Sequence, residues 1–164
     1  MYVSAQKNWQ VQPSSSITFK IKNAGFTVNG TLKGLKAEIR FSPEEYAPSS
    51  IQASVDVNTM DTGIEARDKH LKKSDYFDAA KYPQISMKSR RIAPSKSGDF
   101  IGYFALTIKG TEKEVTVPFK FIEGDTESRF EGNFKINRRD FKVGSGSLIL
   151  SDTVEVFLKI VVKG

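Results

Sequence analysis

The sequence predicts an all-β protein, an eight-stranded antiparallel β-barrel with one short helix in the insertion between strands 4 and 5. Apolar and polar residues alternate with period two through most of the 164 residues, as in strands with one buried face. Short, often Gly-containing turns separate most alternating segments, which favours hairpins. The 12 Phe, against 5 Tyr and 1 Trp, indicate an apolar interior, because Phe has no polar group to satisfy.

The strands follow directly from the alternation. Two segments joined at Gly34 have opposite parity, which indicates one long strand with a β-bulge or bend. The remaining segments are separate strands. A closed barrel is favoured over an open sheet because closure removes exposed edges, and a two-sheet sandwich is the alternative. The alternating segments are residues 17–22, 26–33, 35–41, 51–57, 85–89, 100–108, 115–121, 130–136 and 154–162.

The helix is predicted between residues 51–57 and 85–89. Thr62-Gly63-Ile64-Glu65 has the spacing of a capping box, in which the Thr hydroxyl and Glu carboxylate satisfy free backbone N–H groups. Glu65 with Lys69, and Asp68 with Lys72, are spaced as stabilising i, i+4 pairs. We expect a helix over residues 64–73, followed by a loop that reaches Pro83.

Composition excludes several kinds of chemistry. There is no Cys and a single His, so disulfides, thiolate nucleophiles and multi-histidine metal sites are excluded. The net charge is +6, but the basic residues are interleaved with acids along the chain, which favours a solvated surface over a nucleic-acid site. The longest uncharged apolar run considered, Phe100 to Ile108, is far shorter than the roughly 20 residues of a membrane span.

The N-terminal residues allow two interpretations. Val3-Ser4-Ala5 resembles the small-x-small end of a signal peptide, and an ordinary frayed start is the alternative. We expect residues 1–8 to form a flexible N-terminal extension.

The predicted inward face combines many Phe side chains with small residues and almost no ionisable group. An eight-stranded barrel is just wide enough to be filled by side chains or to hold one small ligand. A ligand inside this barrel would have to be long and apolar, because a charged centre would find no partner there.

Enzyme chemistry would have to depend on His70. This residue lies among charged residues on the predicted short helix, and no Gly-x-Ser-x-Gly elbow accompanies it. A surface or helix-packing role is therefore expected for it, and no catalytic residue and no metal site are predicted.

Three motif series lie in order along the chain. They are Arg67-Asp68-Lys69-His70-Leu71 with Asp75, Phe77-Asp78 and Lys81-Tyr82-Pro83; Gly102 with Leu106-Thr107, Gly110-Thr111 and Val115; and Asn137-Arg138 with Asp140-Phe141. Together with Trp9 and the strand from Ile17 to Lys22, these series resemble the YceI family, the lipocalin-like polyisoprenoid-binding proteins, over nearly the whole chain. Departures occur at Ser14-Ser15 and Asn23, where relatives often carry His, and at Lys142, where Gly is common.

The resemblance implies a single lipocalin-like barrel domain over residues 1–164. It also implies non-catalytic binding, transport or storage of a long-chain isoprenoid lipid, a polyprenyl phosphate or an isoprenoid quinone, in an elongated apolar cavity. The lipid is the expected partner, with no other cofactor. A periplasmic or secreted location is expected, with the cytoplasm as the alternative.

The residues expected to line the cavity come from the inward parity and from the helix and the loop after it, which would act as a lid. Arg67 and His70 are expected at the mouth. The wall residues are Ile17, Phe19, Phe26, Val28, Val55, Val57, Phe104, Leu106, Phe119, Phe121, Phe134, Ile136, Leu158 and Ile160, and the lid residues are Ile64, Leu71 and Phe77.

Other functions stay open at this point. A carrier of fatty acids or fatty amides makes similar demands on an apolar tunnel. A hydrolase using His70 and a filled barrel acting as an interaction module are further alternatives. Outward-facing apolar residues predict a patch for a homodimer, namely Ile101, Tyr103, Phe157 and Val161.

Overall fold

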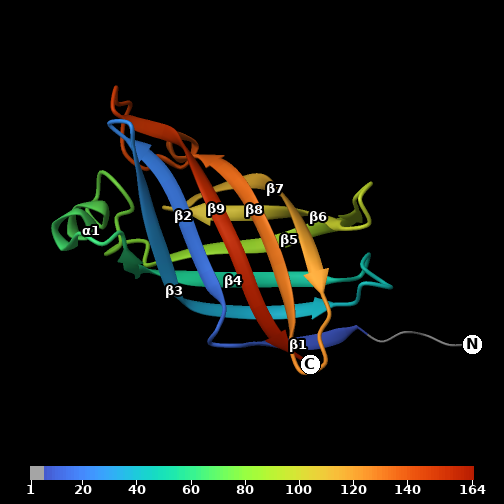
Figure 1. The fold of residues 1–164 in the computed structure, drawn as a ribbon. Helices are drawn as coiled ribbons and strands as arrows, with labels where there is room; N and C mark the ends of the chain where they lie inside the picture. Colours follow the sequence, from blue (N-terminus) through green and yellow to red (C-terminus); the bar gives the residue numbers. More distant parts are fainter. Residues whose placement is uncertain (1–5) are drawn as a thin grey trace, which may run out of the picture.

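A computed structural model describes residues 6–164 and shows a closed antiparallel barrel (Figure 1). The predicted fold class is confirmed. The strands are β1 (Lys7–Val11), β2 (Ser16–Asn23), β3 (Phe26–Phe41), β4 (Ser50–Asp61), β5 (Gln84–Pro94), β6 (Phe100–Ile108), β7 (Thr111–Ile122), β8 (Ser128–Asn137) and β9 (Leu150–Lys163), and the helices are α1 (Glu65–Leu71) and the 3₁₀ helix η1 (Arg138–Phe141).

Eight strands form the barrel wall. Each strand from β2 to β9 pairs with the next one along the chain, and β9 pairs with β2 to close the sheet. Ile17 lies opposite Leu158 across the closing seam. A continuous closed sheet excludes the two-sheet sandwich.

The short strand β1 joins the ends of β3 and β9. Trp9 lies opposite Ile39 of β3, and Val11 lies opposite Val162 of β9. Lys7 and Asn8, which we expected in a flexible extension, therefore belong to a strand. Residues 3–5, to which the signal-peptide interpretation applies, lie outside the described residues.

The predicted irregularity at Gly34 is present. Its φ is 71°, a left-handed conformation that favours Gly, and the register of β3 with β4 shifts on both sides of Lys33. Pairing of β3 with β2 stops at Leu32, and pairing with β1 starts at Ile39. Within residues 33–38 of β3, Lys33 and residues 36–38 therefore pair on one side only, with β4, and the bulge interrupts that pairing at Gly34 and Leu35.

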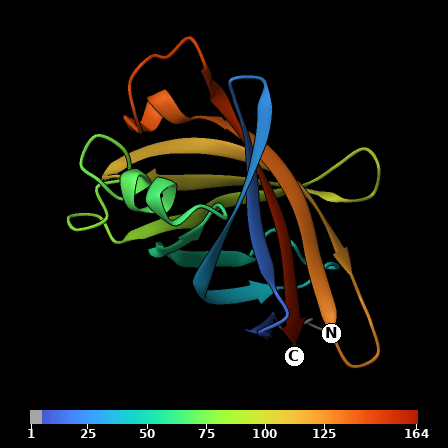
Figure 2. The ribbon, with the colours of Figure 1, turned by 60° about the vertical axis from the view of Figure 1, so that its left-hand side comes forward.

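The barrel has two different ends, which Figures 1 and 2 show on opposite sides. Antiparallel strands place successive connections alternately at the two ends. We call the end with α1 the helix end and the other the aromatic end. The helix end carries residues 24–25, 62–83, 109–110 and 138–149, and the aromatic end carries residues 42–49, 95–99 and 123–127.

Helix α1 lies between β4 and β5 as expected, but the predicted capping box is wrong. Ile64 is the N-cap and makes no side-chain cap bond. The carboxylate of Asp68 instead accepts hydrogen bonds from the backbone N–H and the hydroxyl of Thr62, at 2.9 and 2.5 Å. This use of Asp68 also replaces the expected pair with Lys72, whereas the exposed pair of Glu65 with Lys69 forms at 3.5 Å.

Within residues 6–164, no helix has the length and apolar character needed to cross a membrane.

Candidate ligand-binding site

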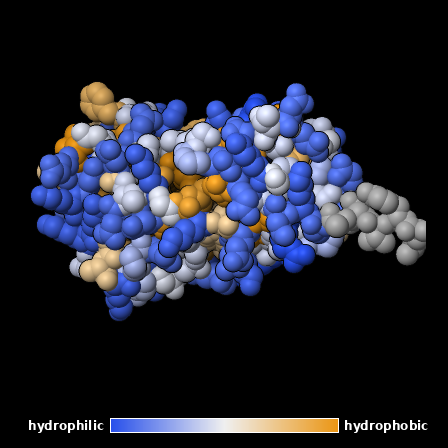
Figure 3. Space-filling model, turned by 90° about the horizontal axis from the view of Figure 1, so that it is seen from below, coloured by the Kyte–Doolittle hydropathy of each residue, from blue (hydrophilic) through white to orange (hydrophobic). Residues whose placement is uncertain are grey.

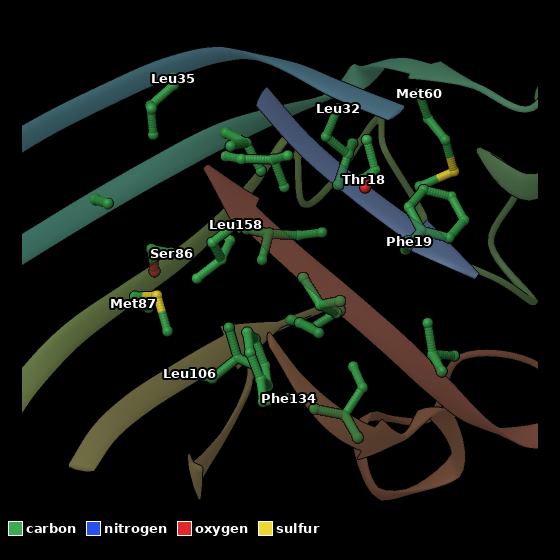
Figure 4. Close-up of a pocket in the computed structure, with 18 of the residues that line it drawn as sticks. Thr18, Phe19, Leu32, Leu35, Met60, Ser86, Met87, Leu106, Phe134 and Leu158 are labelled. Carbon is green, nitrogen blue, oxygen red and sulfur yellow. The ribbon is translucent and has the colours of Figure 1, made fainter. Parts of the chain in front are cut away.

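The barrel encloses a cavity of about 260 Å³ with a mostly apolar wall. Side chains from all eight strands of the barrel wall, β2 to β9, line it, among them Leu32, Leu106 and Leu158 (Figure 4). The α1 insertion and the segment before β9 complete the lining at the helix end. Such a cavity suits an apolar guest, because few side chains in the wall offer a partner for charge.

Most of the expected lining residues lie at this cavity. They come from seven strands and the insertion, as the inward parity predicts. These residues are Ile17, Phe19, Val28, Val55, Arg67, Leu71, Phe77, Phe104, Leu106, Phe119, Phe134, Ile136, Leu158 and Ile160.

Three expected residues lie elsewhere because the barrel tapers or ends. Phe26 follows the turn Ala24-Gly25 and is 78% exposed, since the hairpin extends past the barrel rim. Ile64 is 53% exposed at the start of α1. Phe121 packs into the aromatic end, with its ring 5.1 Å from that of Phe41.

Val57 is displaced from the cavity by a local irregularity in β4. The Asp56 side chain accepts the backbone N–H of Asn58, and its carbonyl accepts the Thr59 hydroxyl. The alternation therefore changes after Val55, so that Met60 reaches the cavity while Val57, 1% exposed, is buried elsewhere.

His70 does not line the cavity either. It is exposed, and its ring packs against Tyr76 at a centroid distance of 5.0 Å. Tyr76, against which His70 packs, lines the cavity instead.

Sequence reasoning missed several lining residues. Leu32, Leu35 and Met87 line the cavity, and the alternation in the sequence already places them on the inward face of their strands. Val143 lies in the segment between η1 and β9, and Leu150 is the first residue of β9. Both precede the alternating residues 154–162, so no periodicity predicts their orientation.

The aromatic end is closed by a packed cluster. Phe41 is fully buried, and its ring lies 5.2 Å from those of Phe100 and Phe130. Trp9 joins the cluster and donates its indole N–H to the carbonyl of Phe41 at 3.0 Å. These edge-to-face contacts pack the barrel interior at this end.

Two arginines line the helix end of the cavity. Arg67 donates to the hydroxyl and the carbonyl of Thr62, at 2.8 and 2.6 Å. Arg138 is 4% exposed and donates to the carbonyls of Val143, Leu150 and Ser151. Arg138 is also paired with the carboxylate of Asp152 at 3.4 Å, so Arg67 supplies the less compensated positive charge where the apolar wall ends.

The surface is hollowed on the side seen from below in Figure 1, and apolar residues are visible at the floor of the hollow (Figure 3). The singly paired stretch of β3 contains Leu35 and Ala37, which line the cavity. The barrel wall lacks strand-to-strand hydrogen bonds along the other edge of this stretch.

Known proteins share this architecture and these motifs. The profile of the YceI-like domain matches residues 9–162. The chain belongs to the YceI family. A UPF0312 protein of Vibrio cholerae is 28% identical to this YceI protein over 136 residues, which cover 79% of this chain and 72% of that one.

Solved structures agree with the assignment. BcnA of Burkholderia cenocepacia is 30% identical and superposes with a TM-score of 0.88, covering 93% of this chain and 99% of that one. A polyisoprenoid binding domain from Saccharophagus degradans, implicated in plant cell wall breakdown, superposes with a TM-score of 0.68 over 98% of this chain and 99% of that one. At 15% identity, this second likeness concerns the fold.

The YceI motif residues mostly build the helix end rather than the cavity wall. Tyr82 packs against Gly110, where an added Cβ would lie 2.8 Å from the Tyr ring. Gly144 likewise leaves no room for a Cβ beside Arg138 and Tyr76, and its N–H donates to the carbonyl of Asp75 at 2.9 Å. The motifs therefore attach the α1 insertion to the neighbouring connections.

The residues expected to form a dimer patch do not form one. Val161 is 7% exposed. Arg91 lies over the ring of Tyr103 at 4.3 Å, and Lys20 lies over that of Phe157 at 5.2 Å. Strands β6 and β9, which carry these residues, are separated by β7 and β8.

Residues 6–164 contain no group of three or more His, Asp or Glu side chains arranged to hold a metal ion.

Proposed function

We propose that this YceI protein binds a long-chain isoprenoid lipid, a polyprenyl phosphate or an isoprenoid quinone, and carries or stores it without chemical change. This proposal rests mainly on the apolar cavity, which is closed by aromatic side chains at one end and bordered by two arginines at the other. The polyisoprenoid-binding domain from Saccharophagus degradans, which shares the fold, supports the same ligand class.

Burial of the isoprenoid chain would supply the affinity. Apolar surface removed from water contributes about 25 cal/mol per Å², and the costs of association are subtracted from that sum. Phe104 and Leu106, each 4% exposed, and the half-buried Phe77 line the cavity with aromatic and branched aliphatic side chains. We propose that the methyl branches of an isoprenoid chain pack against this wall.

A polar headgroup would lie at the helix end. Arg67 and Arg138 line the cavity there, and a guanidinium pairs well with phosphate oxygens. Polyprenyl phosphate would use this charge directly, whereas a quinone ring would need no ion pair. Arg67→Met should therefore weaken binding of the phosphate more than binding of the quinone.

We propose that the protein binds its lipid without catalysing a reaction. The single imidazole, His70, lies outside the cavity wall and packs against Tyr76. Incubation of the protein and of its His70→Ala variant with a long-chain lipid ester tests this directly. Turnover that the substitution abolishes would replace the carrier proposal with a hydrolase.

Two substitutions, one on the inner face and one on the outer face of the barrel wall, test the binding site. Phe104→Asp places a carboxylate in the apolar wall, and Lys120→Ala changes an exposed side chain of β7. In a titration with a radiolabelled polyprenyl phosphate, Phe104→Asp should abolish binding and Lys120→Ala should retain it. Equal loss in two folded variants, checked by circular dichroism, would contradict the proposal.

Competition between an isoprenoid and a straight-chain lipid tests which type of acyl or prenyl chain the cavity prefers. The bound isoprenoid should resist displacement by an excess of a straight-chain fatty acid or fatty amide of equal length. Displacement by the straight chain at equal concentration would instead support a general fatty-acid carrier.

The cellular location stays a proposal. We propose a periplasmic or secreted protein, with the cytoplasm as the alternative. Fractionation of the producing cells with an antibody against the folded barrel distinguishes the two.

A further inference from the structure

The exposed apolar side chains of the barrel are confined to one end. Among residues 6–164, the large hydrophobic residues with high exposure are Phe26 at 78%, Ile64 at 53%, Leu148 at 105% and Ile149 at 62%. All four belong to connections of the helix end or directly flank them. The hairpin and the segment before β9 are joined by a hydrogen bond from the N–H of Ala24 to the carbonyl of Ile149 at 2.8 Å, so Ile149 lies beside the turn that precedes Phe26.

None of these four side chains lines the cavity. Leu148 and Ile149 follow a stretch of Gly and Ser between η1 and β9, and Phe26 projects beyond the rim. Apolar residues also project in the space-filling view from the end opposite to β1 (Figure 3). Exposed apolar groups collected at one place mark an interaction surface more often than singly scattered ones do.

Charge divides along the same axis. The connections of the helix end carry nine Lys and Arg against five Asp and Glu. The connections of the aromatic end carry one Lys against six Asp and Glu. Apolar side chains are thus surrounded by net positive charge at one end, while the other end is acidic.

We propose that the helix end docks on the headgroup region of a bilayer that contains anionic phospholipid. Phe26, Leu148 and Ile149 insert among the upper acyl segments, and lysines such as Lys73 and Lys142 contact the lipid phosphates. Buried apolar area and attraction between basic residues and anionic lipid are the two terms that strengthen peripheral membrane binding. The acidic aromatic end is repelled by the same surface, which fixes the orientation of the barrel.

This docking goes beyond the proposed lipid cargo and does not depend on it. Vesicle binding by ligand-free protein measures the surface, and lipid titration measures the cavity. Failure of one leaves the other standing, because the inserting side chains Phe26, Leu148 and Ile149 do not line the cavity.

A new tryptophan at the proposed contact tests insertion. The single native indole, Trp9, is 8% exposed at the aromatic end and serves as an internal background. With vesicles of phosphatidylcholine and phosphatidylglycerol, the emission of Leu148→Trp should shift to the blue and be quenched by brominated acyl chains. The matched variant Thr126→Trp, in an exposed connection of the aromatic end, should show neither change.

Charge reversal tests the electrostatic part. Lys73→Glu with Lys142→Glu should lower the vesicle partition coefficient at least about tenfold at low salt, because each basic residue near an anionic surface contributes appreciably. Reversal of Lys88 and Lys120, two exposed lysines on the barrel wall, should change it far less. Raising the salt concentration should release the unaltered protein.

Three results would overturn the proposal. They are no co-sedimentation of the unaltered protein with anionic vesicles, equal spectral change in Leu148→Trp and Thr126→Trp, and equal binding to pure phosphatidylcholine. Absence of co-sedimentation would favour a protein partner for the exposed apolar residues. Equal binding to pure phosphatidylcholine would show that anionic lipid is not required. Circular dichroism of each variant confirms that the barrel is intact before the vesicle assays.

Discussion

The ring of Phe19 lies over Gly30, its partner on the neighbouring strand. The two residues are opposite each other in the pairing of β2 with β3, and a Cβ added to Gly30 would clash with three atoms of the ring. Phe19 lines the cavity, so the missing side chain at Gly30 sets how far the ring extends into it. Room for a ligand therefore depends on a residue that contributes no side chain.

Gly30→Ala should reduce ligand binding more than stability. The methyl group forces the ring of Phe19 to rotate into the cavity, where empty space rather than packed side chains receives it. Because overpacking typically costs about 1–3 kcal/mol, we expect lipid affinity to fall at least about tenfold. Isothermal titration with the lipid measures the change.

A second substitution checks the cause. Phe19→Leu in the Gly30→Ala background should restore affinity, because the shorter side chain makes room for the methyl group. Gly146→Ala, where an added Cβ meets ordinary contacts with Arg139, is the matched control. Additive losses in the double variant would contradict the proposed coupling.

The sequence predicted the strands well because alternation reports which face is buried. The parity change at Gly34 correctly located the irregularity in β3, and the break in the alternation, with its helical spacing, placed α1 between β4 and β5. The alternation carried no information on where the barrel wall ends, so Phe26 was placed inside although the hairpin extends beyond the rim. The alternation also gave no information on where the barrel narrows, so Phe121 was expected at the cavity although it packs in the aromatic cluster.

Local hydrogen bonds explain other differences. The turn formed by Asp56 with Asn58 and Thr59 changes the parity of β4 and moves Val57 away from the cavity. Thr62 fits a capping box by spacing, but a buried Asp68 offers it a stronger acceptor. Neither competition is visible in residue spacing alone.

The aromatic cluster should set the maximum length of a bound chain. Phe41→Ala removes its fully buried centre and should lower the free energy of unfolding by about 3–5 kcal/mol. Phe41→Leu is milder and keeps the barrel folded. We expect both variants to accept isoprenoids with more units than the unaltered protein does, measured with a series of increasing chain length. An unchanged length limit would show that the chain does not reach this cluster.

Asp68 should hold the insertion closed over the cavity. Asp68→Ala leaves the buried N–H of Thr62 without its acceptor, which costs about 1–3 kcal/mol, and should speed lipid release. Asp68→Asn keeps an acceptor oxygen and should lose less. Stopped-flow measurement of lipid release tests this, with Glu65→Ala, which breaks an exposed ion pair, as the control. Equal release rates in all variants would exclude a gating role for this contact.

Lys142, where the resemblance to the YceI family led us to expect Gly, has a φ of 60°, a left-handed conformation that favours Gly. A left-handed conformation costs a residue with a Cβ about 1–2 kcal/mol, and the greater freedom of Gly in the unfolded chain offsets part of it. Lys142→Gly should therefore raise the free energy of unfolding by up to about 1 kcal/mol. Urea denaturation measures it, and a clear loss of stability would mean that the Lys side chain makes a compensating contact.

The most direct test of the account is native mass spectrometry of the protein purified from its own cells, followed by organic extraction of any bound molecule. The account predicts a co-purifying polyprenyl phosphate or isoprenoid quinone, one per barrel, that the Phe104→Asp variant lacks. A protein that is empty, and that takes up neither ligand when each is added in excess, would contradict it.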